Sequence, residues 1–253
     1  MWGDILTLKK HYKAVVAAVI LIFFIFLILF SYYTDYKNKL LGVFSTNLRI
    51  STVIVDAGHG GADGGAVALD GSAEKVINLQ ISQKLASLLR LYGFNVIMTR
   101  EDDDSIHDES AETLRQKKVS DIHNREKIIN ENPDAIFISI HQNKFDDSSV
   151  HGTQVFYSKN NPLSLVLAQN IQNTVAQNLQ KDNYRKIKQS GTEIYLLYHS
   201  QIPSVMVECG FVSNYEDLQN LKNEEYQKKI AQSIADGIIK YYKEQDENNG
   251  SQG

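Results

Sequence analysis

Residues 14–34 carry no charged side chain, and the first part of this run, residues 14–30, carries no polar side chain at all. A bilayer core of about 30 Å is crossed by roughly 20 apolar helical residues. The run therefore predicts a transmembrane signal anchor, preceded by a short basic N-terminal segment at residues 1–13. A cleaved secretory signal is the alternative, although no small-residue cleavage site follows Phe30. Either interpretation exports the rest of the chain, because positive charge gathers on the short N-terminal side of the run.

Charge and cysteine content exclude two classes of protein. The net charge is −4, so the chain lacks the basic surface of a nucleic-acid-binding protein, and we expect no nucleic acid partner. Cys209 is the single cysteine of the sequence, which rules out an intramolecular disulfide and a zinc site built on cysteines. The exported part must therefore owe its stability to a hydrophobic core.

Alternating strand and helix patterns begin at residue 50, after a linker at residues 35–49 that has no clear period. Short β-branched runs predict strands at residues 52–55, 95–99, 135–140, 153–157 and 204–207. Apolar residues spaced by three and four predict helices at residues 77–92, 119–130, 163–179 and 226–238. The alternation indicates a single α/β domain, residues 50–243, with a mostly parallel sheet covered by helices on both faces.

Two polar stretches lack any apolar period. Residues 101–118 are predicted to form a solvated loop or a frayed helix, and residues 244–253 a disordered polar tail. Neither stretch is expected to contribute to the core of the α/β domain.

Three polar side chains follow predicted strands, at the points where ligands bind to parallel α/β sheets. His59 comes after the first strand, His141 after the strand at residues 135–140, and Glu208 after the strand at residues 204–207. Because the carboxyl ends of parallel strands meet at one edge of a sheet, we expect these side chains to converge.

Two imidazoles and a carboxylate, with a fourth position left for water, form the ligand set of catalytic zinc. We expect one zinc ion here. Glu74 is the best candidate for the carboxylate ligand, because it opens the helix after the glycine loop that holds His59. Glu208 would then be free to move protons. Asp56 and Asn143 are candidates to orient the imidazoles, and simple loop hydrogen bonding is the alternative for both.

Four motifs, in this order, resemble the zinc-dependent N-acetylmuramoyl-L-alanine amidases of the amidase-3 type. They are VIVDAGHGGADGGAV, Glu74, SIHQN and PSVMVECGFVSN. Matched residue by residue over residues 50–241, the resemblance implies His59, Glu74 and His141 as zinc ligands and Glu208 as the catalytic glutamate.

Further residues of the chain bear on this resemblance. Arg100 and Arg125 are also similar to family residues and are candidates for supporting the site or contacting substrate. Ala57 and Gln142 depart from the family pattern, which usually has proline and alanine there. Neither departure removes a ligand, so both concern the rigidity of the loop and the fit of the substrate.

The resemblance also implies a substrate, because such enzymes hydrolyse the amide between N-acetylmuramic acid and L-alanine of the peptidoglycan stem peptide. A single anchored catalytic domain is similar to the amidases of the spore cortex, which act before muramic-δ-lactam is made. This implies a place between the two membranes around a developing spore, and an accessory lipoprotein as a conceivable partner.

Two other functions stay open at this stage. One is a different zinc hydrolase of the cell wall, either a carboxypeptidase or a deacetylase. The other is a catalytically silent scaffold that binds the wall, for which we would expect a missing ligand or a missing Glu208; the sequence lacks neither.

Overall fold

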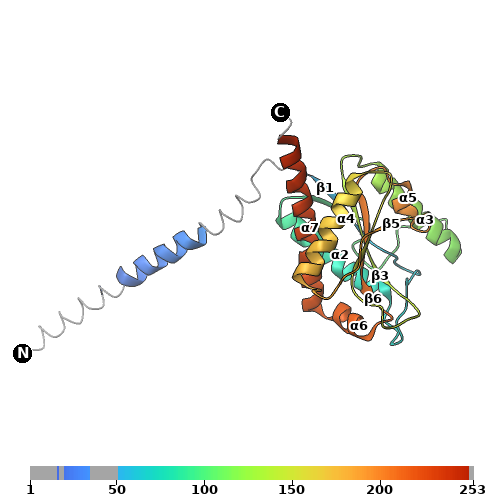
Figure 1. The fold of residues 1–253 in the computed structure, drawn as a ribbon, viewed down its shortest axis with the longest axis horizontal. Coiled ribbons are helices and arrows are strands. Elements are labelled where there is room, and N and C mark those ends of the chain that lie inside the picture. The colour runs from blue at the N-terminus through green and yellow to red at the C-terminus, as the bar shows by residue number, and fades with distance from the viewer. Residues whose placement is uncertain (1–15, 17–19, 35–50, 251–253) are drawn as a thin grey trace, which may run out of the picture. The chain divides into compact units, whose positions relative to one another are not determined.

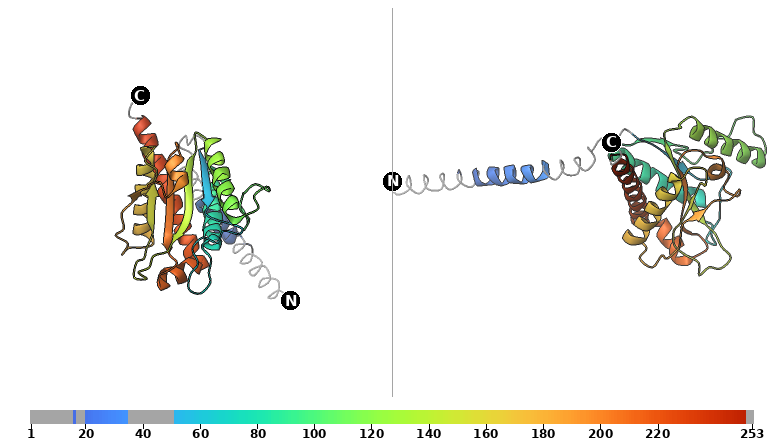
Figure 2. Two further views of the ribbon diagram at one scale, coloured as in Figure 1. Left: turned by 90° about the vertical axis from the view of Figure 1, so that its right-hand side faces the viewer. Right: turned by 45° about the horizontal axis from the view of Figure 1, so that its top comes forward.

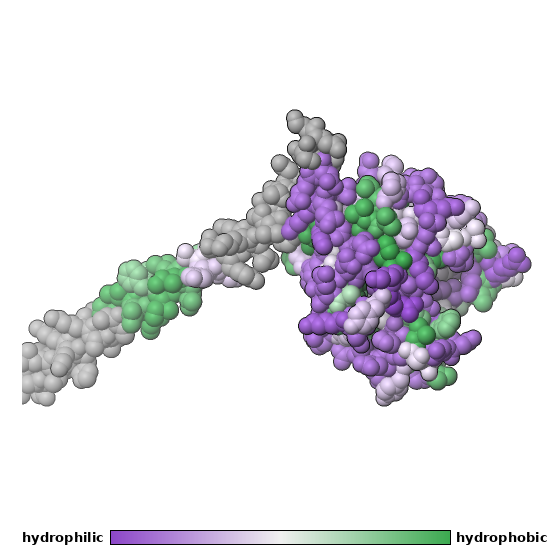
Figure 3. All heavy atoms as spheres, viewed as in Figure 1, coloured by the Kyte–Doolittle hydropathy of each residue, from purple (hydrophilic) through white to green (hydrophobic). Residues whose placement is uncertain are grey.

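The computed structural model describes residue 16, residues 20–34 and residues 51–250, in two units that divide after Arg49. Residues 20–34 form a helix that exposes apolar side chains along its surface (Figure 3). Among the residues described, no helix is both long enough and apolar enough to span a membrane. The expected anchor lies partly outside the described residues, and the basic N-terminal segment and the linker lie entirely outside them.

A six-stranded sheet forms the centre of the second unit, with the strand order β2-β1-β3-β6-β4-β5. Its strands are β1 (Thr52–Ala57), β2 (Asn95–Met98), β3 (Ile136–Asn143), β4 (Gln154–Tyr157), β5 (Lys188–Gln189) and β6 (Ser204–Phe211). The helices of this unit are α2 (Glu74–Leu91), α3 (Leu114–Asn130), α4 (Leu163–Asn178), α5 (Tyr195–His199), α6 (Tyr215–Lys222) and α7 (Glu224–Gly250).

The sheet is mixed, because β4 runs antiparallel to β6 while the other pairings are parallel. Only residues 144–153 join β3 to β4. A return to a parallel strand needs a crossover of about a dozen residues or more, usually with a helix, so this loop reverses the chain instead. The single α/β domain is confirmed, and the prediction of a mostly parallel sheet is refined to a mixed one with one reversed strand pairing.

Helices cover both faces of the sheet (Figures 1 and 2). On one face α2, α4 and α7 pack on apolar strand residues such as Val55, Ile138 and Val207. On the other face α3 and α5 cover a smaller cluster around Ile54 and Phe137. Alternate residues of each strand enter opposite layers, as the period of two in a strand requires.

Three helical features differ from the sequence prediction. Helix α3 begins within the stretch predicted as loop or frayed helix, because Thr113 and Gln116 form a capping box at its N-terminus. The predicted disordered tail is wrong for residues 244–250, which continue α7. Glu244 in that part accepts a hydrogen bond from Asn170 of α4, which joins the last turns of α7 to the body. Helices α5 and α6 were not predicted.

Candidate metal centre

The polar side chains of the site lie on the face of the sheet that α3 and α5 cover. In β3 the side chains of Phe137, Ser139 and His141 point to this face, because they alternate with the residues of the larger core. His141 is paired in register with Glu208 of β6, so these two side chains are direct neighbours across the strands. His59 lies in the loop directly after β1.

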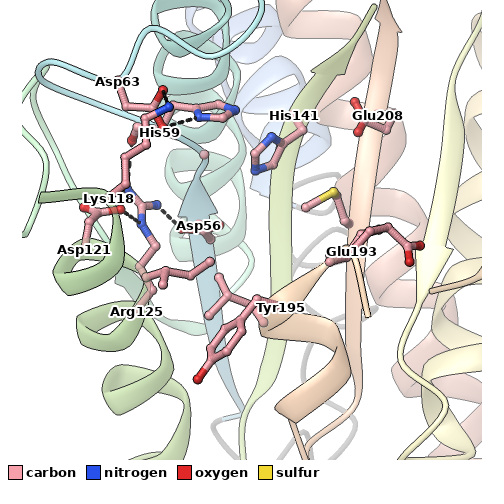
Figure 4. A pocket seen from close by; sticks show the side chains of 15 residues that line it. Asp56, His59, Asp63, Lys118, Asp121, Arg125, His141, Glu193, Tyr195 and Glu208 are labelled. Atoms are coloured by element: carbon pink, nitrogen blue, oxygen red, sulfur yellow. Dashed lines mark hydrogen bonds and ion pairs between the residues drawn. The ribbon is translucent and has the colours of Figure 1, made fainter. Parts of the chain in front are cut away.

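His59, Glu74 and His141 come together at one point, with one ligand atom of each within 4.8 Å of the others (Figure 4 shows the two imidazoles). Glu74 lies between the rings: its Oε1 is 2.9 Å from His141 Nδ1, and its Oε2 is 3.3 Å from His59 Nε2. The two imidazole rings stand edge to face, with centroids 4.9 Å apart. Two nitrogens and a carboxylate in this arrangement fit the donor preference of zinc.

Two glycines leave the space that these ligands occupy. A Cβ at Gly58 would lie 2.1 Å from His141 Nε2, so the rear edge of that ring rests directly on the glycine. A Cβ at Gly65 would lie 2.6 Å from both Glu74 Oε2 and His59 Cδ2, and its φ of +66° also favours glycine. The glycine-dense loop therefore serves to let the three donors approach each other.

Asp63 orients the His59 ring from the side opposite Glu74. Its Oδ2 is 2.9 Å from His59 Nδ1, and its Oδ1 is 2.8 Å from Lys118 Nζ. Burial lowers the pKa of His59, but the hydrogen bonds to Asp63 and Glu74 outweigh this and raise it to about 9. With Nδ1 engaged, His59 presents Nε2 to the centre, which is the usual relation between a ligand imidazole and its carboxylate.

Glu74 is held by backbone and amide donors. Its Oε2 accepts a hydrogen bond from Ala66 N at 2.8 Å, and its Oε1 accepts hydrogen bonds from Gln142 N at 3.0 Å and Asn78 Nδ2 at 3.2 Å. Burial opposes ionisation, yet the bonds to His141 and His59 hold the pKa of Glu74 well below its usual range. Gln142, one of the two departures from the family pattern, also donates from Nε2 to Asn78, so it supports this carboxylate.

Two buried arginines bind the carbonyl groups of the His59 loop. Arg125 donates to Ala57 O at 2.9 Å and His59 O at 2.7 Å, and Arg100 donates to Ala57 O at 2.8 Å and Gly58 O at 3.0 Å. His59 has a φ of +63°, a left-handed conformation that costs energy in any residue with a Cβ. The arginines therefore hold the loop in its strained form. Both side chains are buried and support the site, and Arg125 also borders the pocket beside it (Figure 4).

Asp56 and Asn143 were candidates to orient the imidazoles, with loop hydrogen bonding as the alternative for both. Asp56 is buried beneath the loop, where it pairs with Arg125 and accepts hydrogen bonds from Thr99 Oγ1 and Ser139 Oγ. It therefore anchors an arginine and makes no hydrogen bond to an imidazole. The side chain of Asn143 accepts a hydrogen bond from Lys144 N, which fits the alternative of loop hydrogen bonding. Asp63, which the sequence did not indicate, is the carboxylate that is hydrogen-bonded to His59 Nδ1.

Glu208 lies beside this cluster and differs from every other carboxylate in it. Its Oε2 is buried and has no hydrogen-bond partner among the described residues. Burial raises the pKa of Glu208 to about 7, although the neighbouring His141 opposes the rise. The carboxyl group faces a pocket of about 410 Å³ that also borders His59 and His141 and extends along α3 and the start of α5. Figure 4 shows His141 and Glu208 side by side on their strands.

The fold and the site together define a candidate metallohydrolase of the α/β class. A family model described as N-acetylmuramoyl-L-alanine amidase, of the amidase-3 type, matches residues 53–240. The chain therefore belongs to the family of N-acetylmuramoyl-L-alanine amidases, hydrolases that act on peptidoglycan.

Individual relatives agree with this assignment. The chain is 33% identical over 222 residues to a germination-specific N-acetylmuramoyl-L-alanine amidase of Bacillus subtilis, covering 88% of this chain and 92% of that protein. Its fold is similar to the CwlD amidase of Clostridioides difficile, solved in complex with the GerS lipoprotein. That match has a TM-score of 0.74 and 44% identity, and covers 76% of this chain and 98% of the other. The AmiC2 amidase of Nostoc punctiforme follows, with a TM-score of 0.66, 31% identity and coverages of 76% and 97%.

Proposed function

We propose that this protein is a zinc-dependent amidase that cleaves the bond between N-acetylmuramic acid and L-alanine of the stem peptide. The observation that carries the proposal is the meeting of His59, Glu74 and His141 next to a buried, unpartnered Glu208 oxygen, in a chain of the amidase family. The three donors are the proposed ligands, and Glu208 is the proposed catalytic residue.

The donor set and its surroundings fit a zinc ion. The rings present His59 Nε2 and His141 Nδ1 toward the same carboxylate. Gly58 and Gly65 have no side chain, which leaves the space that these donor groups occupy. When bound, zinc supplies Lewis-acid chemistry and makes water acidic near neutral pH. The low pKa of Glu74 keeps that carboxylate ionised, as a ligand must be.

The proposed role of Glu208 is to move a proton. Its carboxyl group takes the proton of the attacking water and then delivers it to the leaving nitrogen of L-alanine. A pKa of about 7 suits both steps near neutral pH, because the group can exist in either protonation state. The pocket beside it supplies apolar walls from Ile122, Leu196 and Met206, which limit the access of other water.

We further propose that the enzyme acts on the spore cortex, in the pathway to muramic-δ-lactam. The similarity to the germination-specific amidase and to CwlD supports this assignment. The proposed location is outside the cytoplasm, between the two membranes around a developing spore, with residues 14–34 as the anchor. The apolar sequence of that run supports the anchor. An accessory lipoprotein is a candidate partner, because the CwlD structure contains one.

Product analysis tests the proposed reaction. Purified peptidoglycan is incubated with the full-length chain and zinc, and the digest is analysed by mass spectrometry. We expect new amino ends on L-alanine and intact N-acetylmuramic acid. Released acetate would indicate a deacetylase, a released C-terminal amino acid a carboxypeptidase, and an unchanged wall a silent binding protein; each of these results contradicts the proposal.

A pair of variants separates the ligand role from the catalytic role. We expect His59→Ala to lose both zinc and hydrolysis, since two remaining donors hold the metal poorly. Glu208→Ala is expected to retain one zinc per chain while it loses hydrolysis. Metal analysis of the purified proteins decides the point, because loss of zinc from the Glu208 variant would make that residue a ligand.

A further inference from the structure

A row of polar side chains crosses the sheet from the metal centre toward its β5 edge. His141 of β3 pairs with Glu208 of β6, and Glu208 pairs in turn with Gln154 of β4. Residues that are directly opposite in a sheet share a face, so all three side chains lie on the face of the candidate site. Arg185 extends the row, because its guanidinium donates to Gln154 Oε1 at 2.7 Å.

A second row runs beside the first. Met206 of β6, which borders the pocket, pairs with Phe156 of β4, and Phe156 pairs with Lys188 of β5. The Lys188 ammonium lies over the Phe156 ring, 6.0 Å from its centroid. Phe156, Arg185 and Lys188, together with the buried side chain of Gln154, thus form a patch that continues from Glu208 to the β5 edge, which we call the β4–β5 shelf.

Arg185 is held in place without a carboxylate partner. Its guanidinium stacks on the Phe211 ring at 4.8 Å, and Gln154 fixes one of its terminal nitrogens. Its Nε is buried and has no hydrogen-bond partner in the part of the chain that the structure describes, and no ion pair of Arg185 is found there. A guanidinium has five N–H donors in a planar fork that matches a carboxylate. Asp217 is near enough to attract the Arg185 charge but forms no ion pair with it among the described residues, so Arg185 keeps N–H donors for an anion from outside the chain.

The proposed chemistry determines which part of the substrate reaches this surface. Glu208 delivers its proton to the leaving nitrogen, so that nitrogen lies on the Glu208 side of the three metal donors. The peptide continues from the nitrogen, whereas the sugar lies on the opposite side of the scissile bond. On the Glu208 side the next strand is β4, and beyond it β5, so a peptide that extends across the strands in this direction passes over the shelf.

We propose that the β4–β5 shelf binds the stem peptide through the free carboxylate of its second residue, with Arg185 as the main contact and Lys188 as a second cation. The inference rests on the proposed amidase function and adds to it the direction in which the substrate lies and the residues that select an anionic peptide. Arg185 and Lys188 are specificity residues in this assignment, since neither is among the residues that border the catalytic pocket.

Two soluble peptidoglycan fragments test the proposal. They differ in a single group, a free carboxylate or a carboxamide on the second residue of the stem peptide. With the full-length chain and zinc, we expect the carboxylate form to have the lower KM. Arg185→Gln should raise the KM for that form by about tenfold or more, because it removes a charge-assisted hydrogen bond, and should leave the amide form almost unchanged. Lys188→Gln should raise the KM for the carboxylate form by roughly two- to fivefold, as expected of an exposed cation.

Matched variants control for charge and folding. Lys240→Gln removes an exposed lysine of α7, on the other side of the sheet, and should not alter the preference. Arg185→Lys keeps a cation and should retain part of the preference for the carboxylate form. Thermal melting of each variant verifies folding, and if Arg185→Gln fails to fold, Lys188→Gln decides the result.

The outcomes separate this inference from the function on which it rests. If the parent protein hydrolyses neither fragment in the presence of zinc, the amidase assignment fails. If it hydrolyses both fragments with the same KM, or if the Arg185 and Lys188 variants keep the original preference, the amidase assignment stands and the shelf proposal is overturned.

Discussion

Replacing Glu208 by glutamine should make the metal-free protein more stable than the parent, by an amount that grows as the pH rises. The same replacement removes the proposed proton carrier. The pKa of an ordinary glutamate is 4.5, and burial raises that of Glu208 to about 7. A carboxyl group with a raised pKa favours the folded state while it is protonated. Its contribution is therefore fully present below pH 4.5 and is lost progressively as the pH rises to about 7.

The size of the effect follows from the two pKa values. Each unit of difference corresponds to about 1.4 kcal/mol, so ionised Glu208 costs the folded protein about 3 kcal/mol relative to the protonated group. Between pH 5 and pH 8 the loss amounts to about 2–3 kcal/mol, because the unfolded chain is already largely ionised at pH 5. Glutamine has a similar shape and does not titrate. The variant should thus gain about 2–3 kcal/mol over the parent across this range.

Urea unfolding with a chelator present, followed by circular dichroism, measures the difference at both pH values. His59 and Glu74 titrate in both proteins, so their effects largely cancel in the comparison. Glu193→Gln is the control, because Glu193 borders the same pocket but is exposed, and it should show no such gain. An equal stability difference between parent and Glu208→Gln at pH 5 and pH 8 would refute the reasoning.

Three further predictions concern the support of the site. Gly58→Ala and Gly65→Ala should lose zinc, since each new Cβ would overlap a ligand, whereas Gly64→Ala should keep it, because its nearest neighbour is 3.9 Å away. Zinc titration of the three variants checks this, and equal affinities would contradict it. Asp63→Ala should weaken zinc binding by about 10- to 100-fold, because the His59 imidazole would no longer be held in its orientation. Competition with a chelator measures the affinity. Arg125→Met should cost about 3–5 kcal/mol in urea unfolding, because it leaves a buried carboxylate unpaired; a loss below 1 kcal/mol, roughly that of a surface ion pair, would oppose the assigned role.

The parts of the site that sequence reasoning located follow from local patterns. His59, His141 and Glu208 each come at the end of an apolar β-branched run, and the rule for parallel strands brings such ends together. Glu74 was found from its place at the start of a helix. The structure places all four where those patterns indicate, because each position depends on a single neighbouring element.

The supporting contacts were missed because they depend on long-range geometry. Asp56 was a candidate for an imidazole or for loop hydrogen bonding, but its actual side-chain partners lie 43, 69 and 83 residues away in the chain, and no local pattern reveals them. Asp63 is only four residues from His59, yet its orientation depends on a loop with a left-handed residue. Helix α5 has five residues, too few for an apolar period to show.

Two glutamates of this site have opposite pKa shifts, and the difference arises from hydrogen bonding more than from depth. Glu74 accepts N–H donors on both oxygens and faces two imidazoles, so its charged form is favoured. Glu208 is half-buried nearby, and its buried Oε2 has no donor among the described residues, so its neutral form is favoured. Environments that separate two carboxylates in this way assign them different chemical roles. A donor placed beside Glu208 Oε2 would therefore lower its pKa and make it a better metal ligand and a poorer proton carrier.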